Sequence, residues 1–330
     1  MFRKALLILL ALLLTAGALT VAGAESAVPS PEPPEAAPTH SLPSATPVPS
    51  AVQNLVADPD ALDTVHFKMD AEFLHIWFPN IYNEDEALLI FGDEVWMIDC
   101  GDTRSAPRNV LLLYKLGVRR INKLFNSHPH HDHLGGLEAT DNAAHIEELL
   151  VCFPEDSTDT MMAAMLYASS ADIPVSTYSG GDVFTMGGGK VSLTFYLVEG
   201  DELDMNNCSA QTMVQYGSRK MLFTADMERQ GQELAMTQVN PDLLQADILK
   251  YPHHGKSGLQ DDYAAAVNPS LAIVTNTKVD WGGVEYLDYR KIPFLYTGYD
   301  EVYTHIYTDG NVWVVEQIPV ADLLYTGNIN

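Results

Sequence analysis

The chain has 330 residues, 47% of them hydrophobic and 9% aromatic, so it can bury a sizeable core, and a wholly disordered protein is excluded. Its formal net charge is −26 at pH 7. Because so acidic a surface repels phosphate backbones at range, tight nonspecific binding to nucleic acid is disfavoured. The three cysteines, Cys100, Cys152 and Cys208, allow at most one disulfide bridge and no disulfide framework.

The N-terminus has the pattern of an export signal. Arg3 and Lys4 precede an apolar run from Ala5 to Leu14, and Ala22-Gly23-Ala24 offers small residues for cleavage. This predicts a secretory signal peptide over residues 1–24 and a secreted or envelope-associated protein. The apolar run is short for a membrane-spanning helix, so we expect no stable membrane span after cleavage. An uncleaved N-terminal anchor is the alternative.

Residues 25–60 are rich in proline, alanine and serine, which predicts a disordered linker without chemistry of its own. Residues 61–330 have the length of one folded catalytic domain. Hydrophobic periodicity predicts the following elements. Strands are expected at 64–68, 72–78, 87–91, 95–99, 121–126, 150–153, 191–198, 211–216, 220–224, 246–251 and 271–275, helices at 104–116, 142–150, 159–169, 228–237 and 260–267, and a closing hairpin at 302–315.

The most informative stretch is residues 127–136, directly after the predicted strand 121–126. Four histidines and one aspartate lie within six residues here, and a metal site explains such a cluster because metal ions consume several neutral imidazoles. His128 and His130 share one side of an extended segment, whereas Asp132 and His133 lie at the head of a helix and face a second position. One loop, residues 127–136, is therefore predicted to bind two metal ions, and we call it the metal loop. The alternative is a histidine-rich surface loop.

The motif His128-x-His130-x-Asp132-His133 resembles the signature loop of the metallo-β-lactamase-fold hydrolases. Three later stretches, residues 206–209, 222–226 and 249–255, resemble the hydrolase-like domain of the DNA-uptake channel protein ComEC and the secreted phosphorylcholine esterases. The similarity covers about residues 62–316. It implies the α/β class and a four-layer αββα sandwich, in which two mixed sheets lie face to face with helices outside.

The resemblance also implies two divalent metal ions, with zinc favoured over manganese. One ion would take His128 and His130, and the other would take Asp132 and His133. Asp226, which ends a predicted strand, would bridge both ions. A solvated turn aspartate is the alternative for Asp226.

The pair His253-His254 would complete the second site with one imidazole, and His254 is preferred as that ligand. The other imidazole would stabilise charge on the substrate or protonate a leaving group. Asp132, His253 and His254 are therefore the expected catalytic residues. An aspartate at the place of Asp99 orients the metal loop in the family, and a plain strand-end turn is the alternative.

The sequence departs from the family pattern in the stretch 204–209, where many relatives carry a third histidine for the first ion and this chain has none. Asn206 and Asn207 are expected to bind substrate instead. Ala225 replaces the glycine that usually precedes the bridging aspartate. Lys256 replaces a serine and is expected to contact a phosphate, with a solvated lysine as the alternative.

Two metal ions that lower the pKa of bound water would generate a bridging hydroxide nucleophile at neutral pH, and an ion with few protein ligands leaves positions for substrate oxygens. The sequence therefore predicts a secreted binuclear metal-dependent phosphodiesterase. Its phosphoester substrate would be a small molecule or an envelope polymer, such as a choline-phosphate or teichoic-type ester, or a nucleic-acid strand, which the acidic charge disfavours. The alternatives are a carboxylic-ester or thioester hydrolase and a noncatalytic metal-bearing envelope-binding protein. The sequence makes no prediction of oligomeric state.

Overall fold

The computed structural model describes residues 72–200, 203–278 and 282–324. The predicted signal peptide, the linker and the strand expected at 64–68 lie outside these residues, so they stay predictions. In the described ranges, no helix has both the length and the apolar character needed to cross a membrane.

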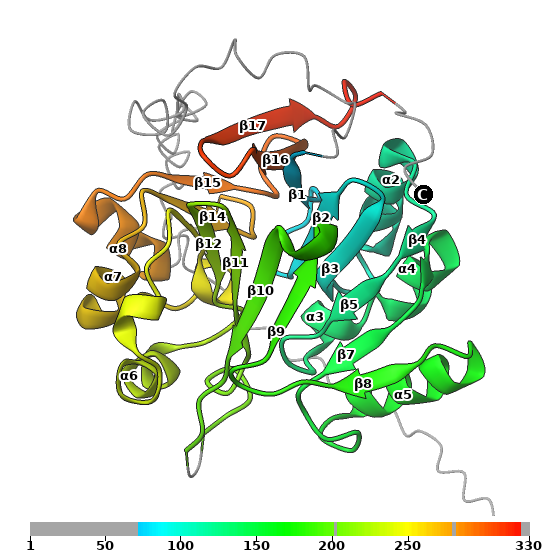
Figure 1. The fold of residues 1–330 in the computed structure, drawn as a ribbon, viewed down its shortest axis with the longest axis horizontal. Helices are drawn as coiled ribbons and strands as arrows, with labels where there is room; N and C mark the ends of the chain where they lie inside the picture. Colours follow the sequence, from blue (N-terminus) through cyan, green and yellow to red (C-terminus); the bar gives the residue numbers. More distant parts are fainter. Residues whose placement is uncertain (1–71, 201–202, 279–281, 325–330) are drawn as a thin grey trace, which may run out of the picture. The chain divides into compact units, whose positions relative to one another are not determined.

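Eight strands form the first sheet (Figure 1). In spatial order they are β17 (Trp313–Pro319), β16 (Val302–Thr308), β1 (Leu74–Phe78), β2 (Glu86–Phe91), β3 (Glu94–Cys100), β5 (Lys123–Phe125), β7 (Leu149–Val151) and β8 (Val175–Thr177). Pairing is antiparallel from β17 to β3 and parallel from β3 to β8. Because β5 runs parallel to β3 and β7, these strands end at the same edge of the sheet. The metal loop begins at this edge, where β5 ends.

Seven strands form the second sheet. In spatial order they are β15 (Phe294–Tyr296), β14 (Leu271–Val274), β13 (Ile248–Lys250), β12 (Arg219–Phe223), β11 (Gln211–Tyr216), β10 (Val191–Tyr196) and β9 (Val183–Met186). The strands from β12 to β15 run parallel, so β12 and β13 end at the same edge. Asp226 and the His253-His254 pair follow these two strands and therefore meet. A separate two-stranded sheet joins β4 (Arg120–Ile121) and β6 (His145–Ile146).

Alternation along the strands explains the layers. In β2, Leu89 packs into the core between the two sheets, whereas Leu88 and Ile90 pack on the outer face under helices. Each such fully buried side chain contributes about 1.5–3 kcal/mol. The first sheet is covered by α2 (Ala106–Leu116), α4 (Leu137–Ala143) and α5 (Asp159–Ser170), and the second by α6 (Arg229–Gln238), α7 (Asp261–Val267) and α8 (Gly282–Arg290). The predicted αββα sandwich is confirmed.

One predicted helix, 142–150, is wrong. The structure ends α4 at Ala143 and places β6 and β7 in this stretch. The side chain of Asp141 accepts a hydrogen bond from the backbone N–H of Ile146 at 2.8 Å, which turns the chain out of the helix. Parallel pairing of β7 between β5 and β8 then outweighs the helical propensity of the glutamates and leucines. The predicted helices 104–116, 159–169, 228–237 and 260–267 are confirmed within two residues. The C-terminal hairpin is also confirmed, and its second strand ends at Pro319, four residues beyond the predicted end.

Candidate metal centre

The metal loop is held by close backbone contacts. It leaves β5 at Phe125, bends at Ser127 and His128, is extended at His130 and enters the short helix α3 (His131–Leu134). A side chain at Gly136 would place its Cβ 2.0 Å from the carbonyl oxygen of Cys100. Only glycine therefore lets this loop lie against the end of β3.

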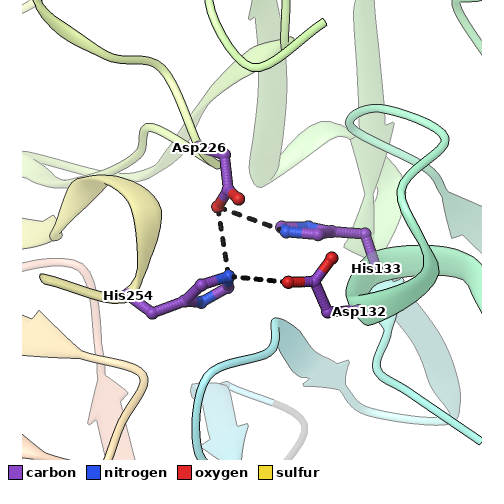
Figure 2. Close-up of side chains that lie close together, drawn as sticks. All are labelled: Asp132, His133, Asp226 and His254. Atoms are coloured by element: carbon purple, nitrogen blue, oxygen red, sulfur yellow. Dashed lines mark ion pairs between the residues drawn. The ribbon is translucent and has the colours of Figure 1, made fainter. Parts of the chain in front are cut away.

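Four side chains from three separate segments converge beside this loop (Figure 2). Ligand atoms of Asp132, His133, Asp226 and His254, which we call the second group, lie within 4.8 Å of one another. Oδ1 of Asp226 is 3.2 Å from Nε2 of His133 and 3.4 Å from Nε2 of His254. The same nitrogen of His254 is 3.5 Å from Oδ2 of Asp132.

A first group consists of His128, His130 and Asp226. Nε2 of His128 is 3.0 Å from Nδ1 of His130 and 3.9 Å from Oδ2 of Asp226. The two carboxylate oxygens of Asp226 thus face different groups, which is the arrangement a bridging ligand requires. The structure brings together every residue predicted to bind metal, and their roles as ligands stay predictions.

The carboxylate of Asp99 holds the metal loop in place. Its carboxylate accepts hydrogen bonds from the backbone N–H of Ser127 at 2.7 Å and from the Ser127 hydroxyl at 2.6 Å. Nδ1 of His133 donates to the same carboxylate at 2.8 Å, so Nε2 of His133 is turned toward Asp226. The orienting role expected of Asp99 is therefore visible in its contacts.

A second supporting carboxylate, Asp85, was not predicted. Its Oδ1 accepts hydrogen bonds from Nδ1 of His254 at 3.2 Å and from the hydroxyl of Thr275 at 2.6 Å. The ammonium group of Lys250 pairs with the other oxygen and donates to the carbonyl of Ala225 at 3.0 Å. A lysine in the otherwise apolar strand β13 was the available signal, because a buried lysine needs a partner.

The electrostatics of the centre favour cations. Burial lowers the pKa of His254, but the carboxylate of Asp226 and its neighbours outweigh it and raise this pKa to about 10. Burial also lowers the pKa of His133, but the carboxylates of Asp226 and Asp99 outweigh it and raise this pKa well above its ordinary value. Burial keeps the pKa of His128 well below its ordinary value. The second group therefore attracts positive charge, whereas His128 is already a neutral donor.

The donor set fits metal ions. Nε2 of His133, Nε2 of His254 and Oδ1 of Asp226 are buried and have no hydrogen-bond partner among the described residues. Leaving such atoms unsatisfied costs about 1–3 kcal/mol each, and one ion would satisfy all three. Imidazole nitrogens with carboxylate oxygens are ligands suited to zinc.

His253 approaches from the other side of Asp226. Its Nε2 lies 3.5 Å from Oδ2 of Asp226, and its Nδ1 lies 2.8 Å from Oε1 of Glu228. His253 is outside both groups, whereas His254 is inside the second. Glu228, at the start of α6, was missed by sequence reasoning because nothing in its local pattern marks it.

The residues expected to bind substrate have mixed environments. Asn207 is buried and uses its side-chain amide inside the protein, accepting from the N–H of Gly231 at 2.7 Å and donating to Asp204 at 3.0 Å. Substrate contact by Asn207 thus stays a prediction without geometric support. Oδ1 of Asn206 is buried and has no hydrogen-bond partner in the described ranges. Lys256 is exposed beside the His253-His254 turn. Both remain predictions.

The sandwich and its two groups of histidine and aspartate side chains are typical of metal-dependent hydrolases. Comparison with known proteins points to the same class. The family model of the metallo-beta-lactamase superfamily matches residues 87–267, more than half of the chain. The chain belongs to this superfamily, a family of binuclear metal hydrolases.

Two curated proteins are similar over shorter stretches. ComE operon protein 3 from Bacillus subtilis is 24% identical over 166 residues, which are 49% of this chain and 21% of that protein. Ribonuclease Z from Pediococcus pentosaceus is 31% identical over 97 residues, which are 28% of this chain and 30% of that protein. The chain therefore matches less than a third of the length of either relative.

Among solved structures, the metallo-beta-lactamase fold protein YhfI from Bacillus subtilis is 12% identical, with a TM-score of 0.46 over 74% of this chain and 100% of that chain. A metallo-beta-lactamase from Cronobacter sakazakii is 18% identical, with a TM-score of 0.36 over 50% of this chain and 69% of that chain.

Proposed function

We propose that the protein is an exported, binuclear metal-dependent phosphodiesterase. The observation that carries the proposal is the position of Asp226, whose two oxygens face two separate sets of imidazoles at distances of 3.2–3.9 Å. A single carboxylate between two donor sets suits two ions held close together. The leader pattern of residues 1–24 supports export.

The donor sets leave room for a substrate. The first group offers three side chains and the second offers four, with Asp226 shared. Two zinc ions bound there would lower the pKa of a water molecule and neutralise charge on the oxygens of a phosphodiester. His128, His130, Asp132 and His133 would hold these ions in place, and the buried walls around them would exclude bulk water.

The imidazole of His253 is the candidate proton donor for the leaving oxygen. Burial lowers its pKa, and the contact of Nδ1 with Glu228 turns Nε2 toward Asp226 and the first group. In its imidazolium form, with Nδ1–H held by Glu228, an imidazole oriented in this way would pass the proton on Nε2 to the departing alkoxide and remain as the neutral ring. His254 is buried and enclosed by Asp85 and Thr275, so it would act as a ligand.

The test is hydrolysis of bis(4-nitrophenyl) phosphate by protein loaded with zinc or manganese, with 4-nitrophenyl acetate assayed in parallel. We expect H128A and D226N to lower kcat/KM for the phosphodiester by about a thousandfold, since the ions supply several kcal/mol of transition-state stabilisation. D261N is the control, because Asp261 is an exposed carboxylate paired with Arg290. Equal activity in all variants, or turnover of the acetate alone, would refute the proposal.

A further inference from the structure

A cavity of about 750 Å³ opens beside the metal loop. We call it the side pocket. Its walls are residues 178–181 after β8, residues 196–199 at the end of β10, residues 238–240 with Leu243 after α6, and the side chains of Cys152, Phe153 and Cys208. Its volume lies in the range of small-molecule sites in proteins.

The side pocket shares a wall with the candidate metal centre. Sγ of Cys152 donates to the carbonyl oxygen of Ser127 at 3.4 Å, and the backbone N–H of Ala210 donates to the same oxygen at 3.0 Å. Ser127 precedes His128, and Cys208 is two residues before Ala210. The side pocket therefore lies directly beside the backbone that carries His128.

The charge of the pocket selects against anions. Of the described residues that line it, Glu199 alone carries a formal charge, and none is a lysine, arginine or histidine. Burial raises the pKa of Cys152 to about 12 and also raises the pKa of Cys208, so both thiols are neutral. A second phosphate on the substrate would find no counter-charge here and would meet a carboxylate.

The walls offer rings and aliphatic groups at fixed positions. Phe153, Tyr196 and Leu197 are half-buried, and the hydroxyl of Tyr178 is already used in donating to the carbonyl of Asn126 at 2.7 Å. The backbone of Glu199 is clamped to the side chain of Gln238, which accepts at 2.9 Å and donates at 2.6 Å. Hydrogen bonds therefore fix two walls of the pocket, at Tyr178 and at Glu199, and the aromatic side chains offer a surface on which a flat group can stack.

We propose that the side pocket binds the uncharged, ring-bearing arm of a phosphodiester whose phosphate is cleaved at the metal centre. This assignment rests on the proposed function and narrows its substrate class. Small diesters with a neutral arm are substrates, and polyanionic chains are disfavoured.

The kinetic test uses the methyl ester of thymidine 5′-monophosphate, with and without a second phosphate on its 3′ oxygen. The methyl group is too small to fill the pocket, so the nucleoside occupies it. We expect the extra phosphate to raise KM about fivefold in the wild type, and E199K to abolish most of this ratio. Y196A raises KM for the ester without the 3′ phosphate about tenfold, whereas the control Y196F stays within about twofold. A ratio unchanged in E199K together with an unchanged KM in Y196A overturns the proposal.

A second measurement does not depend on turnover. Maleimide alkylation of Cys208 is followed by mass spectrometry in metal-free protein, where Cys100 is fully buried and the raised pKa of Cys152 keeps its thiol unreactive. Thymidine at twice its dissociation constant slows alkylation about threefold, and thymidine 3′,5′-bisphosphate at the same concentration does not. If thymidine protects the Cys208 thiol but no diester is cleaved, the pocket stands and the proposed function falls. If diesters are cleaved and thymidine gives no protection, the pocket assignment falls.

Discussion

The ion pair between Lys250 and Asp85 supports the candidate centre, because Asp85 also accepts a hydrogen bond from His254. Both side chains are buried, with 2% and 8% of their surface exposed. Replacing Lys250 with methionine keeps the stem and deletes the charge, so the buried Asp85 carboxylate loses the ammonium group and keeps only His254 and Thr275 as partners. Breaking a buried pair in this way costs about 3–5 kcal/mol of unfolding free energy, a large part of the 5–15 kcal/mol that a domain has.

The assay is urea denaturation of metal-free K250M, D85N and the double variant. We expect the double variant to recover at least about 2 kcal/mol relative to the sum of the single changes, because D85N removes the charge that K250M leaves unpaired. In chelator competition, D85N should weaken binding of one ion about 10–100-fold, since Asp85 orients His254. D261N is the control. Additive effects in the double variant, or unchanged ion affinity in D85N, would refute this account of Asp85.

Two further predictions concern the ions themselves. D226N should reduce the bound metal, measured by elemental analysis after dialysis, at both positions, because Asp226 belongs to both groups; loss of a single ion would show that it does not bridge. An ion at the second group must displace protons from His133 and His254, because both imidazoles have raised pKa values. The apparent affinity for this ion should therefore rise between pH 6 and 9, by about tenfold per pH unit for each proton displaced. Affinity at the first group should rise less steeply, because the pKa of His128 is already low and no proton is displaced from that imidazole. Parallel pH profiles for the two ions would contradict the difference.

The metal loop could be predicted from sequence because its ligands are contiguous and their spacing maps onto a strand end and a helix start. Asp226 and the His253-His254 pair could be placed because each follows a predicted strand in a stretch that resembles the family. The supporting contacts could not be predicted in this way. Lys250 and Asp85 are 165 positions apart, and their pairing depends on how the two sheets face each other. The helix expected at 142–150 was wrong for a related reason, since strand pairing by distant segments overrode local propensity.

The His253-His254 turn shows how the chain delivers adjacent imidazoles to opposite oxygens of Asp226. Both residues have left-handed backbone, with φ of 48° and 51°, so His253 reaches Oδ2 and His254 reaches Oδ1. Each non-glycine residue in this conformation costs about 1–2 kcal/mol. The cost is offset by Asn276, which donates to the carbonyl of His254 at 2.9 Å, and by the N–H of His253, which donates to Ala225 at 3.0 Å.

This strain can be measured by comparing two truncations that remove the same imidazole. In urea denaturation of metal-free protein, H253G should be more stable than H253A by about 1 kcal/mol, because glycine adopts a positive φ without the Cβ penalty. At an ordinary helical or extended position the order is reversed, since glycine loses more backbone entropy on folding. If H253A proves the more stable of the two, the turn is not strained, and the left-handed geometry that separates the two imidazoles is not the form the protein adopts in solution.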